Sequence, residues 1–298
     1  PFTLPLARLF AKKVVAYVHY PTMSRDMFAK VEEGQKDFNN KIIFTKNLRK
    51  CKILYYRIFL FLYRLCGWFT TVVICNSKWT SKRIDDVWNR KSLVLYPPAN
   101  LSCRECPPKE RVNAMVSLAQ FRPEKLHLVQ IQIFEKVLKE VPNTVFWVIG
   151  GSRNSIDDVY IETLRQYAAD LGIRSNQIQF IVNASREEID LKLTTAKCAL
   201  HTKKDEHFGI SLLEFLQAKI PIVAHKSGGP ETDILLPNEA FGYLASNTSE
   251  FTDKVVHVLK SFESDEVRRK VDNGFNSLNR FLDDEAFGRK FSSLVLGL

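Results

Sequence analysis

The chain has 298 residues, of which 45% are hydrophobic and 26% charged, and its formal net charge is +10. This length suits two domains, and the composition excludes a low-complexity or disordered chain. The charge is uneven, because residues 1–110 hold 20 Lys and Arg against 8 Asp and Glu, whereas residues 111–298 hold 23 against 25. We therefore expect the first part to face an anionic surface. The sequence has no zinc-finger spacing or RRM signature that would favour nucleic acid.

The first predicted element is a buried strand at 14–18, which is followed directly by His19. The carboxyl end of a strand is where an open α/β sheet places its ligands, although a lone histidine is more often structural. The next segment, 23–47, has few regular signals. It is either a mobile loop on the acceptor side of a site or an irregular connection.

Residues 53–75 form a long apolar stretch that contains Arg57 and Arg64. The stretch could span a bilayer, but arginine near the centre of a spanning helix is costly. Because arginines seven residues apart share one helix face, we favour an interfacial helix, with 46–75 as a membrane-surface segment. The alternatives are a core helix that ends near Gly67 before a buried strand, and, least favoured, a transmembrane span.

A short strand at 93–96 is followed by two proline pairs that exclude a helix or a central strand. We interpret 97–111 as a linker that joins a partial N-terminal domain at 1–96 to a second domain at 112–277. The linker contains Cys103 and Cys106. Without a second Cys/His pair, these two residues are weak evidence for metal, and we interpret them as reduced thiols.

After the linker, strands and helices alternate at the spacing of βαβ units, which predicts a parallel, doubly wound α/β sheet. The expected strands are 114–119, 145–149, 178–182, 198–202 and 221–225, and the expected helices are 125–140, 159–170, one capped by Ser185, and the tail at 278–298. No strand is followed by the glycine motif of a dinucleotide site or a P-loop.

Glu206 and Glu214 bracket the start of a predicted apolar helix. A glycosidase pair does not fit well, because eight helical residues rise about 12 Å and hydrolase carboxyls lie about 5–9.5 Å apart. The spacing suits a nucleotide sugar, with the sugar at Glu206, the diphosphate at the Phe208-Gly209-Ile210 amides and the ribose at Glu214. By spacing alone, an ordinary surface pair on a helix is more common.

The sequence E-H-F-G-I-S-L-L-E at 206–214, followed by S-G-G-P-E, resembles the E-x(7)-E motif of retaining family 4 glycosyltransferases with the GT-B fold. Four further motifs narrow the resemblance to the eukaryotic dolichol-pathway mannosyltransferases that use GDP-mannose. They are Y-V-H-Y-P-T-M-S-R-D-M at 17–27, N-S-K-W-T at 76–80, Y-P-P at 96–98 and A-Q-F-R-P-E-K at 119–125.

This resemblance implies two Rossmann-like domains, with the tail helix at 278–298 crossing back to the first of them. Only three candidate strands precede the linker, whereas a doubly wound sheet usually has five or six. We therefore expect the first domain to be incomplete and the chain to be an N-terminally truncated piece.

The resemblance also implies retaining α-1,2-mannosyl transfer from GDP-mannose to a dolichol-diphosphate-linked oligosaccharide. It places the reaction on the cytosolic face of the endoplasmic reticulum membrane, with other mannosyltransferases of the pathway as partners. The alternatives are a family 4 enzyme with another donor or acceptor, and an inactive nucleotide-binding fragment.

In this scheme Glu206 and His19 are the catalytic residues, and Arg122 and Lys125 hold the diphosphate as a guanidinium fork and a point charge. No D-x-D motif occurs, and no metal cofactor is expected. The other donor-binding residues implied are Phe208, Gly209, Ile210, Glu214, Gly228, Gly229, Val182 and Asn183.

Overall fold

The computed structural model describes residues 2–22, 46–99, 110–235, 239–281 and 283–296. The chain divides into two compact units, residues 1–98 with 284–298, and residues 99–283. Most of the predicted linker, with Cys103 and Cys106, and most of the segment 23–47 lie outside the described residues.

The first unit contains a parallel sheet in the order β1-β2-β3, formed by Val15–Val18, Val72–Cys75 and Leu93–Val94. Strands β1 and β3 are each shorter than the predicted strands at 14–18 and 93–96, and β2 is the buried strand considered after Gly67. Helix α4, Lys78–Trp88, was not predicted; its N-cap is Ser77, whose side chain accepts from the Thr80 amide. The Trp88 ring of α4 meets the buried Tyr63 ring at 5.4 Å between centroids, in the core of this unit.

Helix α3, Lys46–Trp68, ends just before β2. The stretch 53–75 is therefore a helix followed by a strand, as in the core-helix alternative, but only one side of the helix is buried. Gly67 packs against the Trp88 ring on that side. In the part of the chain that the structure describes, no helix has both the length and the apolar character needed to cross a membrane.

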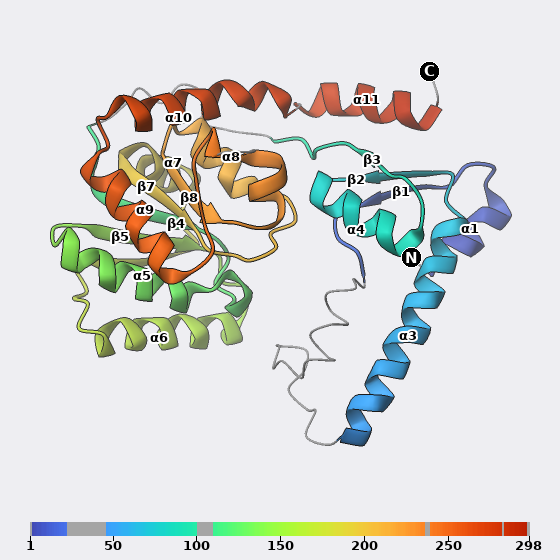
Figure 1. The fold of residues 1–298 in the computed structure, drawn as a ribbon, viewed down its shortest axis with the longest axis horizontal. Coiled ribbons are helices and arrows are strands. Elements are labelled where there is room, and N and C mark those ends of the chain that lie inside the picture. The colour runs from blue at the N-terminus through green and yellow to red at the C-terminus, as the bar shows by residue number, and fades with distance from the viewer. Residues whose placement is uncertain (1, 23–45, 100–109, 236–238, 282, 297–298) are drawn as a thin grey trace. The chain divides into compact units, whose positions relative to one another are not determined.

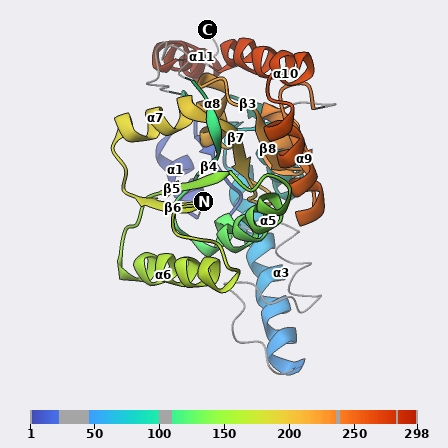
Figure 2. The same ribbon diagram turned by 90° about the vertical axis from the view of Figure 1, so that its left-hand side faces the viewer.

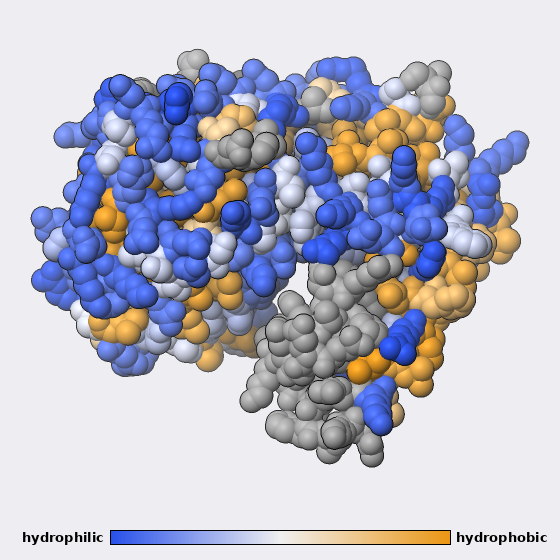
Figure 3. All heavy atoms as spheres, in the orientation of Figure 1, coloured by the Kyte–Doolittle hydropathy of each residue, from blue (hydrophilic) through white to orange (hydrophobic). Residues whose placement is uncertain are grey.

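The other side of α3 is an exposed apolar face (Figure 3), which together with α1, Leu4–Phe10, we call the α1/α3 face. Its apolar side chains are between 44% and 89% exposed; they are Leu6, Leu9, Phe10, Leu54, Tyr55, Ile58, Phe61 and Leu62. The exposed side chains of Lys50, Arg57 and Arg64 lie on the same helix.

The C-terminal helix α11, Asp284–Leu296, belongs to the first unit. Phe287 and Phe291 of α11 contact the Tyr17 ring of β1, at 5.9 and 6.5 Å between centroids. The expectation of one helix over 278–298 was too simple, because a 3-10 turn at Ser277–Arg280 precedes α11. A further helix before it, α10 at Asp265–Asn276, was not predicted.

The second unit has a parallel sheet in the order β6-β5-β4-β7-β8-β9, which confirms the predicted doubly wound sheet. Figure 1 and Figure 2 show α5 and α6 on one face and α7 and α8 on the other. The strands are β4 Val112–Leu118, β5 Val145–Gly150, β6 Ile178–Val182, β7 Ala196–His201, β8 Ile222–His225 and β9 Tyr243–Ala245. The helices are α5 His127–Glu140, α6 Ser155–Asp170, α7 Arg186–Thr195, α8 Ile210–Gln217 and α9 Thr248–Lys260.

At the amino end of this sheet, Arg111 joins three elements. Its guanidinium donates to the carbonyl oxygens of Ala196 at 2.5 Å and of Ala218 and Lys219 at 2.7 and 2.8 Å. Burial lowers the pKa of Arg111 to about 10.

The strand order locates the crevice in which such sheets bind ligands. The chain runs outward from β4 through β5 to β6, and then returns to β7 on the other side of β4. The carboxyl ends of β4 and β7 therefore form a topological switch point, where ligands of open α/β sheets bind.

Candidate functional site

Glu206 lies at the switch point, in the loop that follows β7. Its residue surface is only 8% exposed. One carboxylate oxygen, Oε2, accepts from Lys125 Nζ at 2.9 Å, and the other, Oε1, accepts from Lys203 Nζ at 3.0 Å and from the His207 amide at 3.2 Å. His201 Nε2 lies 3.6 Å from Oε2. Cationic and polar groups thus face both oxygens.

These neighbours keep Glu206 ionised. Burial alone would raise the pKa of the carboxyl, but its interaction with His201 and the charges of Lys125 and Lys203 outweigh burial and hold the pKa well below its usual range. The next side chain, His207, is instead uncharged. Burial and the charge of Lys203 lower its pKa to about 4, so this imidazole is neutral at physiological pH.

Lys125 reaches Glu206 from the other side of the switch point. It ends a 3-10 turn, Pro123–Lys125, that follows β4. Its backbone is held there, because its amide donates to the Arg122 carbonyl at 2.9 Å and its own carbonyl accepts from Thr202 Oγ1 at 3.2 Å. Arg122 is half-buried at the N-cap of the same turn, and among the described residues it forms no ion pair.

The turn after β8 packs directly against the Glu206 loop. The Gly229 amide donates to the Glu206 carbonyl at 2.7 Å, and the Ser227 hydroxyl accepts from the Asp205 amide at 2.8 Å. Gly228 has φ +69, and a Cβ on it would lie 2.4 Å from the Glu206 carbonyl oxygen. The resemblance implies that these two glycines bind the donor, and the structure shows that they make close contact with the Glu206 backbone.

Helix α8 begins beside Glu206. Its N-cap, Gly209, has φ +103, a conformation that favours glycine, and Phe208 before it is buried against the Phe281 ring at 5.6 Å. The first amides of a helix have no intrahelical acceptor and carry partial positive charge, which suits a phosphate. Ile210, the first helical residue, is 53% exposed.

Glu214, one turn along α8, is paired with Arg186. The Arg186 Nη1 donates to Glu214 Oε1 at 2.8 Å, and Nη2 lies 2.6 Å from Asp190 Oδ1. Arg186 is the first residue of α7. Glu214 is therefore held in a definite orientation by a neighbouring helix.

The two remaining donor-side positions lie at the end of β6. Val182 is the last residue of the strand, and Asn183 follows it with φ +54. The Asn183 side-chain oxygen accepts from the Ser152 amide at 3.0 Å. In the first unit, His19 is exposed directly after β1, and its ring lies 4.8 Å from the Tyr17 ring.

Sequence reasoning missed Lys203, His201 and Arg186. His201 carried a usable signal, because it is a polar residue at the carboxyl end of an otherwise apolar strand. Lys203 is three residues from Glu206, but nothing in the sequence separates it from its exposed neighbour Lys204. Arg186 carried no signal, since its partner Glu214 is 28 residues away.

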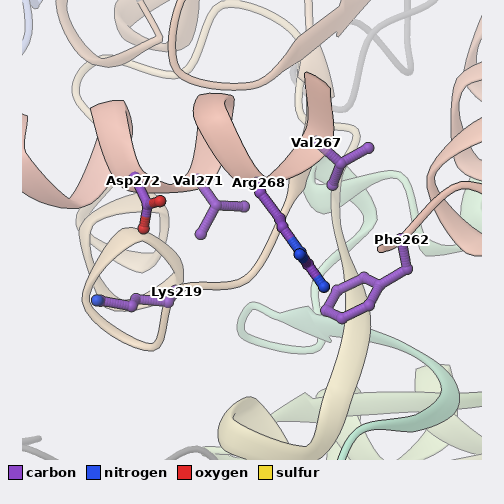
Figure 4. A pocket seen from close by; sticks show the side chains of 6 residues that line it. All are labelled: Lys219, Phe262, Val267, Arg268, Val271 and Asp272. Carbon is purple, nitrogen blue, oxygen red and sulfur yellow. The ribbon is translucent and has the colours of Figure 1, made fainter. Parts of the chain in front are cut away.

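A separate cavity of about 250 Å³ lies at the opposite end of α8 (Figure 4), lined by Lys219, Phe262, Val267, Arg268, Val271 and Asp272. None of these is among the predicted site residues. Within the described part of the chain, no group of three or more His, Cys, Asp or Glu side chains is placed to hold a metal ion.

Two α/β units with parallel sheets, and a buried ionised glutamate at the switch point of the second, define the class as GT-B glycosyltransferases. A solved structure of this fold, Anabaena HepE in complex with UDP, aligns with a TM-score of 0.73 over 99% of this chain and 76% of that one, at 15% sequence identity. At this identity the likeness concerns the fold alone.

The chain belongs to the family described as glycosyl transferases group 1, whose model matches residues 104–273. Residues 1–88 match a second model, ALG11 mannosyltransferase N-terminus. These matches confirm the resemblance inferred from the five motifs.

The chain is similar to proteins of Mus musculus and Homo sapiens, each named GDP-Man:Man(3)GlcNAc(2)-PP-Dol alpha-1,2-mannosyltransferase. Each is 36% identical over 95% of this chain. The chain spans 61% of the length of these two relatives.

Proposed function

We propose that the chain carries the donor site of a retaining α-1,2-mannosyltransferase, which moves mannose from GDP-mannose to a dolichol-diphosphate-linked oligosaccharide. The bond from the sugar C1 to the β-phosphate oxygen breaks, and a bond forms from C1 to a 2-hydroxyl of an acceptor mannose. The hydroxyl proton passes to the departing diphosphate, so no protein nucleophile is needed.

The observation that carries this proposal is the environment of Glu206. An ionised carboxylate, buried among cations beside a helix N-terminus, offers an acceptor for sugar hydroxyls and a negative charge for the positive charge that develops on the sugar. Lys125, with Arg122 and the first α8 amides, supplies the positive charge that a departing diphosphate requires. Glu214, oriented by Arg186, takes the ribose hydroxyls.

The remaining predicted residues extend this assignment. Val182 and Asn183 contact the guanine base, and the 227–230 turn fixes the Glu206 loop through Gly228 and Gly229. His19 keeps the catalytic role that the family resemblance implies. The reaction takes place at the cytosolic face of the endoplasmic reticulum membrane, as the resemblance implies, near other mannosyltransferases of the pathway. The α1/α3 face is the surface that meets an anionic bilayer.

The test compares Glu206→Gln with Glu214→Gln. We expect Glu206→Gln to lower kcat at least a hundredfold while GDP still binds, because the amide cannot support positive charge on the sugar. Glu214→Gln should weaken GDP binding about tenfold, because it loses the charge that holds ribose hydroxyls. Turnover is measured with a lipid-linked oligosaccharide and GDP affinity by titration calorimetry.

A donor panel of GDP-mannose, UDP-glucose and UDP-GlcNAc separates this function from other family 4 activities. Turnover of a UDP-sugar but not of GDP-mannose would contradict the donor. Full activity in both variants would place the site elsewhere. GDP binding without turnover of any donor would support a nucleotide-binding fragment.

A further inference from the structure

The Glu206 carboxylate is held between two lysines, one for each oxygen. Lys125 reaches Oε2 from the loop after β4, and Lys203 reaches Oε1 from the loop after β7. The lysine side chains are 22% and 16% exposed and that of Glu206 is 11% exposed, so these contacts are shielded from water. A single carboxylate thus has one ammonium group more than charge balance requires.

This inference rests on the proposed function, in which Lys125 also binds the donor diphosphate. In that case the second ammonium group, that of Lys203, has a role. The backbone of Lys125 is fixed by Arg122 and Thr202, so only its side chain can turn. Phosphate and Glu206 then compete for the same Nζ. A buried carboxylate that loses its only cationic partner is strongly disfavoured, and this cost would be subtracted from donor affinity.

Lys203 removes that conflict because it acts on the other oxygen of Glu206. His201 cannot replace it, since its Nε2 faces Oε2, the oxygen that Lys125 also contacts, at 3.6 Å. Lys204, the adjacent residue, is exposed and forms no ion pair with any described residue.

We propose that Lys203 is a positioning residue that keeps Glu206 paired and oriented when Lys125 turns to the donor diphosphate. Lys203 itself does not contact the donor. It acts through Glu206, and it allows one lysine to serve the carboxylate in the free site and the phosphate in the occupied site.

The first measurement is the affinity of the full chain for GDP and GDP-mannose, by titration calorimetry. Lys203→Met should weaken both affinities about tenfold. In this variant the phosphate competes for Lys125 with a Glu206 carboxylate that has no other lysine partner. Lys203→Arg should keep affinity near that of the unmodified chain, and Lys204→Met is the matched control with no expected change. Thermal unfolding without nucleotide verifies that each variant folds, and Lys203→Gln replaces the methionine variant if that one does not.

The decisive variant is the double substitution Lys203→Met with Glu206→Gln. A neutral amide does not compete for Lys125, so GDP affinity should return to that of the unmodified chain even though turnover is lost. A direct contact between Lys203 and phosphate predicts the opposite, with affinity still weak in the double variant, and that result would overturn the proposal. Unchanged GDP affinity in Lys203→Met would overturn this inference but not the proposed function. Absence of GDP binding by the unmodified chain would overturn both.

Discussion

Gly228 shows how a single residue shapes the candidate site. It combines a positive φ of +69 with a predicted Cβ position 2.4 Å from the Glu206 carbonyl oxygen and 2.8 Å from the Glu206 nitrogen. Gly228→Ala should therefore lower the free energy of unfolding by roughly 2–4 kcal/mol, from backbone strain and from steric overlap together. Urea unfolding at pH 7 measures the loss.

Gly172 is a matched control for this substitution. Its φ is +76, nearly the same, but a Cβ there meets nothing within 4 Å. Gly172→Ala should lower the free energy of unfolding by only about 1 kcal/mol, the strain of the backbone conformation alone. Equal losses in the two variants would show that the contact with the Glu206 loop does not matter.

His127, the first residue of α5, makes stability depend on pH. It is fully buried, and burial lowers its pKa from 6.5 to about 4. The unfolded chain therefore binds a proton on this residue below pH 6.5 while the folded chain does not, so the stabilising contribution is present above pH 6.5 and is lost as the pH falls toward 4. At about 1.4 kcal/mol per pH unit, the loss is on the order of 3 kcal/mol.

The measurement is urea unfolding at intervals from pH 7 to pH 4, with His127→Phe as the comparison. The phenyl ring keeps an aromatic contact with Phe121, which stacks on His127 at 5.3 Å, but cannot take a proton. The slope of stability with pH should be shallower in the variant. Identical slopes would mean that His127 does not titrate in this way.

At the scale of elements, helix α3 carries apolar side chains on its exposed side as well as on its buried side. Ile58 and Phe61 are 53% and 60% exposed, with exposed Arg57 and Arg64 nearby. If this side lies in the headgroup region, Ile58→Glu with Phe61→Glu should weaken binding to vesicles that contain phosphatidylserine at least tenfold, through lost apolar burial and added charge repulsion. Co-sedimentation measures the bound fraction.

Helix α6 supplies the matched control for that experiment. Ile156 and Val159 are 76% and 68% exposed, so they present similar apolar groups to solvent on the other unit. Ile156→Glu with Val159→Glu should leave vesicle binding unchanged. An equal loss in both double variants would show that binding depends on general surface hydrophobicity and not on the α1/α3 face.

At the scale of the whole molecule, the cytosolic placement predicts that the three N-x-S sequons at Asn100, Asn183 and Asn247 carry no glycan. Asn183 lies at the edge of the sheet proposed to bind the nucleotide. Asn247 caps α9 by accepting from the Glu250 amide at 3.0 Å, and its Nδ2 donates to the Glu250 carboxylate at 2.7 Å. Asn100 is outside the described residues.

Peptide mass spectrometry of the protein from its natural source tests this placement. All three peptides should have their unmodified masses. Deamidation after glycosidase treatment, restricted to one sequon, would identify a modified site. A glycan on Asn183 would contradict both the cytosolic placement and the assignment of the nucleotide site.

Elements that carry a strong local sequence signal could be predicted without the structure. Apolar runs of five or six residues located β4 to β8 of the second unit. The Ser185 cap was also identified correctly, since its hydroxyl accepts from the nearby Glu188 amide. The E-x(7)-E pattern and four other motifs sufficed for the family. Short or weakly patterned elements, such as β9 and α4, were missed because few residues carry their signal.

The pairing of charged side chains, in contrast, could not be predicted from local patterns. Lys125 and Glu206 are 81 residues apart, and Arg186 and Glu214 are 28 apart, so their pairing depends on the strand order that brings β4 beside β7 and on the packing of α7 and α8. The same holds for α3, whose composition is apolar on most sides. Which side is buried was decided by Trp88 packing against Gly67 and Tyr63, a contact that no local pattern encodes. Local signals specify elements, whereas a site and a surface arise from contacts between residues distant in the sequence.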